Sequence, residues 1–358
     1  MIQSSRVEKQ TLFLVQVLRA VAALMVVVHH ATIMRAEFID PTKPTWLNGA
    51  SGVDIFFVIS GLVMTISSSS LQHAPHPMRA FLARRVERIV PLYWLATTLK
   101  IALLIAAPAV ALRPLGSPWH IFASYFFIPS FNAAGALHPV LVVGWTLNYE
   151  MLFYLLFAIC LGFALPLLQF LALALGVLSA AALVIPHTAP AVFSFCHPIV
   201  LEFLYGVLLA YAMKAGKSLP PVVCWVLVAA GFTVLMSVPW GAESLLRPFI
   251  WGFPAAAIVA GAVGLEPALG MRTPRWMLEL GDASYSIYLT HGFVLPVIGM
   301  LLLRIHLRGS ISSVLAIVLG VAGSIILAEI VYRTVERPLM RYFRGRSRRA
   351  VSVERIGN

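Results

Sequence analysis

The feature that most constrains this chain is a series of ten long apolar runs. Each has about 18 to 23 residues, so as a helix rising about 1.5 Å per residue it can cross about 30 Å of hydrocarbon. Runs of this length favour helices over the short alternating strands of a membrane β-barrel. We therefore expect an all-α integral membrane protein, a bundle of about ten transmembrane helices. The runs are 12–34, 50–70, 90–109, 144–164, 167–186, 196–213, 221–238, 246–264, 283–304 and 311–332.

Composition excludes the soluble alternatives. Of the 358 residues, 60% are hydrophobic and 11% are charged, whereas about 25% are charged in an average soluble domain. A soluble fold of this size could not bury so much apolar surface, so a cytosolic enzyme and a disordered protein are both excluded. Cys160, Cys196 and Cys224 lie singly in apolar runs, without the spacing of a zinc site or a disulfide framework. We expect them to be small packing residues.

The distribution of basic residues predicts the orientation. With the N-terminus in the cytoplasm, 19 of the 26 Lys and Arg residues fall in inside segments and six in outside segments. This asymmetry predicts that both termini are cytoplasmic, and it accounts for the net charge of +12 without a nucleic-acid partner. We expect a cytoplasmic N-terminus (1–11), one transmembrane domain (12–335) and a basic cytoplasmic tail (336–358) that rests on anionic lipid.

Two ionisable residues in the first run are candidates for function. Arg19 and His30 are eleven residues apart, which is about 20° from a whole number of helical turns. They therefore share one face, with His30 about 16 Å further toward the outside, while His29 points away from it. Because an ionisable group inside a bilayer costs about 2.5–3.5 kcal/mol, such a pair on one face points to function.

A basic cluster precedes the third run. In FLARRVERIVPLYW, Arg84, Arg85 and Arg88 have spacings of three and four residues, and Pro91 suits the start of a helix. Arginines converging at a helix N-terminus would suit phosphate groups. Simple anchoring by positive charge on the cytoplasmic side is the alternative.

Carboxylates also occur in the runs. Asp54 and Glu150 lie near the outer starts of their runs, close to the expected depth of His30, where either could orient and stabilise an imidazole. Each could instead tie helices together. For Glu202, Glu329 and His291, a structural role and a functional role both remain open. The aromatic outer segment 110–143 suits the membrane interface, and could alternatively stack on a sugar.

Taken together, these segments resemble the acyltransferase-3 family of membrane acyltransferases over about residues 12–340. The residues of VLRAVAALMVVVHH and WTLNYEMLFYLLF are most similar to those of bacterial exopolysaccharide O-acetyltransferases of the succinoglycan type. The motifs are VLRAVAALMVVVHH, GVDIFFVISG, FLARRVERIVPLYW, WTLNYEMLFYLLF, LEFLYGVLLA, LGDASYSIYLTH and the closing VERP at 335–338.

The resemblance implies an activity and a set of site residues. The family moves an acyl group, usually acetyl, from cytoplasmic acyl-CoA to a hydroxyl of an envelope glycan. Its Arg and His eleven residues apart correspond to Arg19 and His30, which makes His29 the weaker candidate. Its Arg-x-x-Arg motif corresponds to Arg85 and Arg88. Its acidic residue after the Trp-Ser/Thr-Leu motif corresponds to Glu150, although Met151 and Leu152 replace the Glu-Gln that many members have next.

The expected mechanism joins these residues. The phosphates of acetyl-CoA would lie on Arg84, Arg85 and Arg88, and its arm would pass Arg19 so that the thioester ends near His30. His30 would accept the hydroxyl proton, with Asp54 or Glu150 as its partner. Direct transfer and an acyl-histidine intermediate both remain open. No metal is expected, because a thioester is already activated.

The expected partners follow from this reaction. They are acyl-CoA, a glycan or lipid-linked oligosaccharide, membrane lipid and possible polysaccharide assembly proteins, at a bacterial inner membrane. Two other function classes fit the same pattern. A transporter would also have many spans and buried charges, and a subunit of a polysaccharide export machine would need no catalytic residue.

Overall fold

The computed structural model describes residues 12–71, 74–106, 115–186, 188–238, 244–305 and 310–343. Within these ranges the chain is helical and contains no β-strand. The main helices are α2 (Phe13–Phe38), α3 (Gly52–Ser67), α4 (Pro77–Ala106), α5 (Pro118–Tyr125), α6 (Trp145–Gly162), α7 (Leu167–Ala181), α8 (Pro190–Phe195), α9 (Leu201–Lys214), α10 (Pro221–Ser237), α11 (Phe253–Leu269), α12 (Arg275–Asp282), α13 (Ser284–Arg304) and α14 (Ser310–Val331).

The prediction of an all-α membrane protein is confirmed. Eight helical segments of the described chain are long and apolar enough to cross a membrane, and α7 and α10 are shorter apolar helices. A helix therefore occupies each of the ten predicted runs. Large apolar side chains point outward from several helices, as on α7 (Leu173), α10 (Val222) and α14 (Val314), each more than 60% exposed. Such surfaces are typical of contact with lipid.

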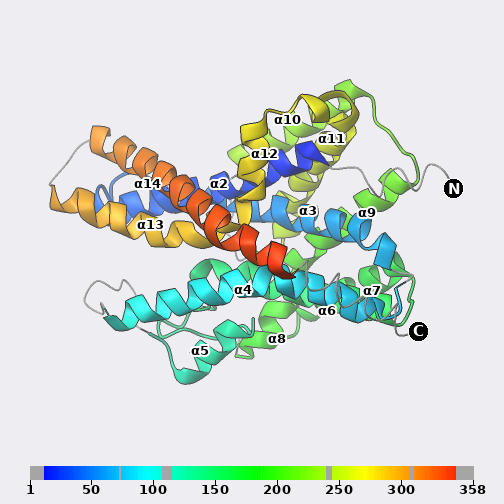
Figure 1. Cartoon of the computed structure of the whole chain (residues 1–358), viewed down its shortest axis with the longest axis horizontal. Coiled ribbons are helices and arrows are strands. Elements are labelled where there is room, and N and C mark those ends of the chain that lie inside the picture. Colours follow the sequence, from blue (N-terminus) through cyan, green and yellow to red (C-terminus); the bar gives the residue numbers. More distant parts are fainter. Residues whose placement is uncertain are drawn as a thin grey trace.

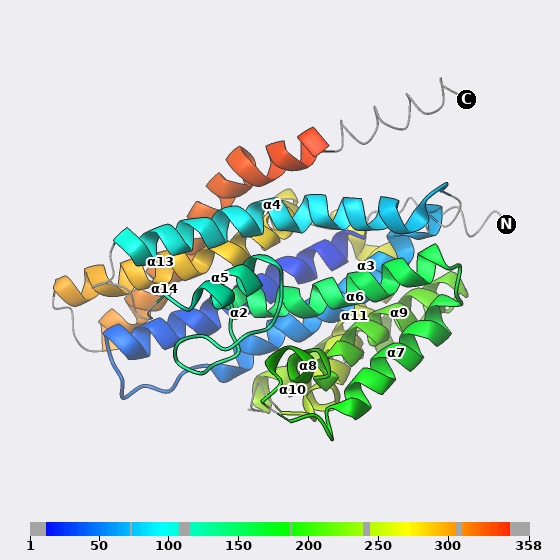
Figure 2. The same cartoon turned by 90° about the horizontal axis from the view of Figure 1, so that it is seen from below.

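The helices pack into two connected groups around α2 and α3. Figure 1 shows α2, α13 and α14 side by side, and these three helices contact one another. Helix α9 packs against α3, α10 packs against α11, and α11 contacts both α2 and α3. Figure 2 shows that the start of α2 and the end of α14 lie toward the same end of the molecule. The inner faces of α2, α3, α4, α6 and α13 thus surround a common interior.

Glycines bring the backbones of α3 and α9 together. A Cβ atom at Gly61 would lie 2.0 Å from the carbonyl oxygen of Phe203, and one at Gly206 would lie 2.0 Å from that of Val58. Small residues at helix crossings are a common means of association in membranes, where lipid removes most of the hydrophobic driving force. This close crossing fixes α3, and with it the side of the interior that carries Asp54 and Ser60.

The third apolar run differs from its prediction. Its helix, α4, begins at Pro77, and Pro91 lies inside it instead of at its start. An internal proline is tolerated in membrane helices where neighbouring groups satisfy the freed carbonyl. The expectation that Arg84, Arg85 and Arg88 lie at a helix N-terminus is therefore wrong. They lie two to three turns into α4, beyond the reach of the helix-terminal charge.

The run 246–264 and the aromatic outer segment 110–143 both contain short helical elements, and residues 110–114 lie outside the described residues. The run that Pro248 and Pro254 interrupt forms a π-helical turn, Pro248–Gly252, followed by α11. The aromatic outer segment contains α5, where Phe122 stacks between Trp119 and Phe126 at centroid distances of 5.8 and 4.6 Å. These three rings are about half exposed. The expected N-terminal segment 1–11 and residues 344–358 of the expected tail lie outside the described residues.

Candidate active site

A cavity of about 110 Å³, partly open to the outside, lies where five helices meet. It carries two of the predicted arginines, Arg19 from α2 and Arg88 from α4, and the predicted carboxylate Glu150 from α6. A cavity that combines cationic and acidic side chains in an otherwise apolar bundle is a candidate binding site. The other lining residues are Val53, Phe56, Phe57, Ile59, Ser60, Val63, Met64, Ile89, Thr146, Leu147, Tyr154, Ser284, Tyr285 and Tyr288.

Arg19 is held in the cavity by a chain of hydrogen bonds from α12. Its Nη1 donates to Oε1 of Gln16 at 3.1 Å, and Nε2 of Gln16 donates to Asp282. Asp282 is partly exposed. Its partial burial raises the pKa of its carboxyl, while the positive charge of Arg19 opposes that shift. Gln16 and Asp282 therefore fix the direction of the guanidinium. Nothing in the sequence indicated that residues so distant along the chain would pair.

The three arginines of α4 do not converge, which corrects the expectation from their spacing. Arg88 lines the cavity, whereas Arg84 is exposed. Arg85 is buried, with its guanidinium carbon 5.5 Å from the centre of the Phe81 ring and its Nη2 donating to Ser67 at 3.3 Å. Among the described residues, its Nε has no hydrogen-bond partner. The three residues thus extend from the surface to the cavity along one helix.

Glu150 lies at the arginine end of the cavity. It accepts hydrogen bonds from the hydroxyls of Tyr154 and of Ser60, the latter at 3.4 Å. The described contacts of Glu150 do not include His30, so the geometry does not support its expected role as the partner of that imidazole. Glu150 interacts electrostatically with Arg19 and with Arg85. Its carboxylate balances part of the positive charge there.

A second carboxylate, Glu336, belongs to the same end and was missed by the sequence analysis. It is almost fully buried and accepts a hydrogen bond from Ser286 at 2.5 Å. It also interacts electrostatically with Arg19 and Arg88. The sequence contained one signal, the position of Glu336 in the closing VERP motif. That motif did not indicate which side chains Glu336 would contact.

Histidines from two helices meet further along α2, about two turns before its end at Phe38. His30 approaches His291 of α13, with 3.3 Å between His30 Nδ1 and His291 Nε2 and 4.9 Å between the ring centroids. His29 points elsewhere, with its Nδ1 2.9 Å from the carbonyl oxygen of Trp46. The expectation that the two neighbouring histidines differ in direction thus agrees with the geometry. The meeting with His291 could not be read from the sequence.

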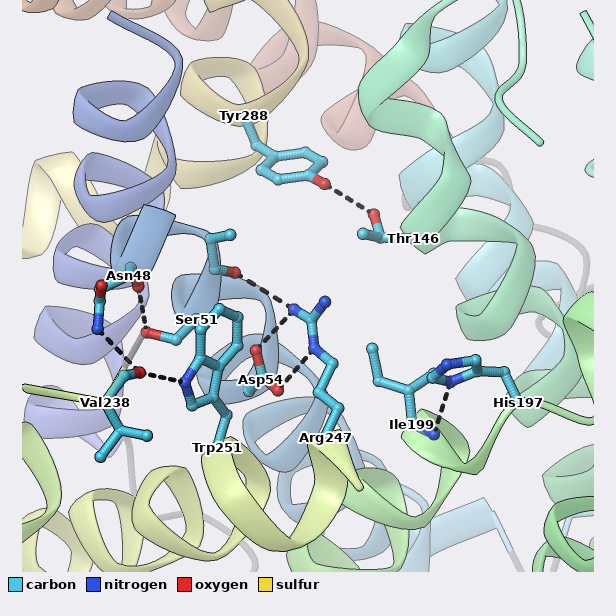
Figure 3. A network of polar contacts seen from close by, with 11 residues as sticks. Asn48, Ser51, Asp54, Thr146, His197, Ile199, Val238, Arg247, Trp251 and Tyr288 are labelled. Carbon is cyan, nitrogen blue, oxygen red and sulfur yellow. Dashed lines mark hydrogen bonds and ion pairs between the residues drawn. The ribbon is translucent and has the colours of Figure 1, made fainter. Parts of the chain in front are cut away.

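Tyr288 connects the cavity with the histidines. Its ring lines the cavity, and its centroid lies 6.2 Å from that of His291, one helical turn further along α13. Its hydroxyl lies 3.0 Å from that of Thr146 (Figure 3). Tyr288 thus links the cavity, which carries Arg19 and Arg88, to the histidine pair, although neither histidine lines that cavity.

Asp54 is engaged by a partner that the sequence did not suggest. Arg247 donates from Nε to Oδ1 at 3.0 Å and from Nη2 to Oδ2 at 2.8 Å, and both side chains are fully buried (Figure 3). The guanidinium also lies over the rings of Trp145 and Trp251. A buried carboxylate needs a cation and hydrogen bonds, and Arg247 supplies both. The expectation that Asp54 orients His30 is therefore not supported by the geometry.

The arrangement suits the handling of an acyl donor and an acceptor from opposite ends. Cationic side chains at one end can hold an anionic group, and an imidazole at the other can accept a proton. The three cysteines are buried and free, as expected of packing residues. Among the described residues, no group of three His, Cys, Asp or Glu side chains is placed to hold a metal ion.

Comparisons with known proteins agree with this chemistry. Residues 14–333 match the model of a family described as an acyltransferase domain. The chain is 37% identical over 316 residues to the exopolysaccharide production protein ExoZ of Rhizobium meliloti, covering 85% of this chain and 93% of that protein. It is 29% identical to the putative membrane-bound transacylase BcsY of Komagataeibacter xylinus, covering 85% of this chain and 78% of that protein.

A more distant relative is longer than this chain. The peptidoglycan O-acetyltransferase OatA of Listeria monocytogenes is 24% identical over 372 residues, covering 92% of this chain and 56% of that protein. This chain thus spans about half the length of that relative. No solved structure matches the chain significantly.

Proposed function

This chain belongs to the acyltransferase-3 family and is a multi-pass membrane acyltransferase; from this premise we propose that it acylates an exopolysaccharide. The donor would be cytoplasmic acyl-CoA, with acetyl as the group transferred. The acceptor would be a sugar hydroxyl of the polysaccharide or of its lipid-linked repeat unit. Similarity to a protein named for exopolysaccharide production and to an O-acetyltransferase supports this substrate class.

The basic end of the interior would bind the donor. Arg84 is exposed, Arg88 lines the cavity, and the buried Nε of Arg85 lacks a partner among the described residues. Arginines bind phosphate through paired N–H donors, so this series would hold the phosphates of the coenzyme while its arm enters beside Arg19. The cavity, about 110 Å³, is smaller than the roughly 300–1,000 Å³ of pockets that enclose a whole drug-sized ligand. That size favours a narrow arm and a short acyl group.

The proposed reaction uses His30 as a general base. Its imidazole accepts the proton of the sugar hydroxyl while the hydroxyl oxygen attacks the thioester carbonyl carbon. The carbon–sulfur bond then breaks, and the coenzyme sulfur leaves with the proton that His30 returns. One ester and one thiol form, and the histidine ends neutral. Glu150 and Glu336 would balance the arginines and keep the donor arm in place.

The proposed orientation puts this basic end in the cytoplasm. The three arginines lie in the first half of α4. Figure 2 shows the start of α4 toward the same end of the bundle as the start of α2, which fits donor entry from the side where acyl-CoA is made. The acceptor would reach His30 from the opposite side of the inner membrane. Polysaccharide assembly proteins could deliver it there.

The observation that carries the proposal is one helix, α2, with a cavity arginine near its start and a histidine eleven residues on. It can be tested with membranes that contain the protein, labelled acetyl-CoA and the lipid-linked glycan of a producing strain. We expect label in the glycan with the wild type and none with His30→Ala. Arg88→Ala should raise the KM for acetyl-CoA about tenfold or more, equivalent to about 1.4 kcal/mol of lost donor binding.

A matched control removes a positive charge elsewhere. Lys217 is exposed in the short connection between α9 and α10, so Lys217→Ala should transfer label like the wild type. Transfer that persists in His30→Ala would show that His30 is not the base. No CoA-dependent label, with the acceptor confirmed present, would favour the transporter or the export subunit.

A further inference from the structure

His30 and His291 form a pair inside the bundle, and His291 has no role in the proposed reaction. His291 lies on α13, which packs directly on α2, and its side chain is 1% exposed. A buried polar ring in a membrane protein needs hydrogen-bond partners, because neither lipid nor water can satisfy it there. Its partners are the carbonyl oxygen of Ile287, 3.2 Å from Nδ1, and Nδ1 of His30, 3.3 Å from Nε2.

These contacts together select one tautomer for each ring. His30 Nδ1 lies 2.9 Å from the carbonyl oxygen of Val26, and a carbonyl can only accept, so Nδ1 of His30 carries the proton. By the same reasoning, the contact with Ile287 places the proton of His291 on Nδ1. Nε2 of His291 is then an acceptor facing the Nδ1 proton of His30. The opposite assignment would set the lone pair of His30 Nδ1 against the oxygen of Val26.

We infer that His291 is a positioning residue for His30: its Nε2 accepts the Nδ1 proton of His30 and so keeps the lone pair on Nε2 of His30 for the acceptor hydroxyl. This inference rests on the proposed function, in which His30 is the base. The carboxylate of a serine-protease triad holds its histidine in the same manner. Here a neutral imidazole does so, and the carboxylates expected to partner His30, Asp54 and Glu150, are engaged elsewhere.

The pair also stabilises the charge that forms during transfer. When His30 takes the hydroxyl proton it becomes an imidazolium, and its Nδ1–H becomes a stronger donor to His291 Nε2 and to the Val26 carbonyl. The proton accepted on Nε2 leaves with the coenzyme sulfur, so both rings return to their starting tautomers. His291 gains and loses no proton in the cycle.

The reach of the side chain gives a matched pair of test variants. Gln places its terminal amide where His places Nε2, whereas Asn ends near the position of Nδ1 and cannot reach His30. His291→Gln therefore keeps an acceptor for the Nδ1 proton, and His291→Asn keeps the same chemical group without the contact. Thr290→Val is the packing control, because the Thr290 hydroxyl bonds back to Ser286 within the same helix.

The experiment measures acetyl transfer to the glycan by the full-length protein in membranes, at equal amounts of folded protein judged from a single size-exclusion peak in detergent. We expect His291→Asn to lower kcat about 100-fold, the low end of a general-base contribution, with the KM for acetyl-CoA unchanged. His291→Gln should recover at least about a tenth of the wild-type kcat. Thr290→Val should match the wild type.

Each outcome separates this inference from the function on which it rests. If the wild type transfers acetyl and His30→Ala does not, the proposed function stands. Equal kcat for His291→Asn and the wild type, or equal losses for the Asn and Gln variants, would then overturn the positioning role alone. A higher KM with kcat unchanged would overturn it in favour of donor binding. Absence of transfer by the wild type would overturn the proposed function and this inference together.

Discussion

The buried ion pair between Asp54 and Arg247 yields the sharpest stability prediction. Two charge-assisted hydrogen bonds of 3.0 and 2.8 Å join the side chains, and both side chains are fully buried. At about 3 Å and an effective dielectric constant of about 20, the Coulomb attraction is roughly 5 kcal/mol before the cost of desolvation. Removing one member leaves the other charge buried without its partner, which typically costs about 3–5 kcal/mol.

Because of Glu202, we expect the loss of Asp54 and the loss of Arg247 to destabilise the protein by different amounts. It is fully buried, interacts electrostatically with both members, and lies within hydrogen-bond reach of the Asp54 carboxyl. After Asp54→Asn, Glu202 remains as an acid beside Arg247, so we expect a loss of about 3 kcal/mol. After Arg247→Met, two carboxyls remain without a cation, and the loss should be about 5 kcal/mol. The double variant should lose at least about 2 kcal/mol less than the sum of the single losses.

The assay is thermal unfolding of the detergent-solubilised protein, followed by the loss of its size-exclusion peak. A loss of about 3 kcal/mol should lower the Tm by at least about 5 °C. Glu329→Gln is the matched control, because its partner Arg333 is 61% exposed and an exposed pair contributes at most about 1 kcal/mol. An unchanged Tm for Asp54→Asn, or strictly additive losses, would refute the reasoning. A stable but inactive Asp54→Asn would return Asp54 to the catalytic role expected from the sequence.

Two further predictions concern packing. Glu266 accepts hydrogen bonds from the amides of Phe13 and Leu14 at 2.7 and 2.9 Å and so caps α2; Glu266→Ala should cost about 1–2 kcal/mol, visible as a lower Tm, and an unchanged Tm would show that water caps the helix equally well. Gly61→Ala should prevent the close crossing of α3 and α9 and reduce the yield of folded protein severalfold. Gly176→Ala is the control and should leave the yield unchanged, because a Cβ atom there has no neighbour within 4 Å. Equal yields for the two variants would contradict the contact.

The local pattern of the sequence determined the secondary structure and one functional face. Apolar runs long enough to cross a bilayer demand helices, because every backbone polar group must be satisfied within its own segment. The same periodicity placed Arg19 and His30 on one face of α2, and the motif resemblance identified the family. Helix ends were less predictable: Pro91 indicated a start, yet α4 begins at Pro77 and continues through Pro91.

Only the tertiary structure decided which partner each buried polar group meets. Asp54 and Arg247 are 193 residues apart, and His30 and His291 are 261 residues apart. Periodicity shows which side of a helix a residue occupies, but the helix that covers that side depends on how all the helices pack together. The sequence therefore determined that charged and imidazole groups lie inside the bundle. Packing decided that Asp54 stabilises the fold through Arg247, while His30 faces a second histidine.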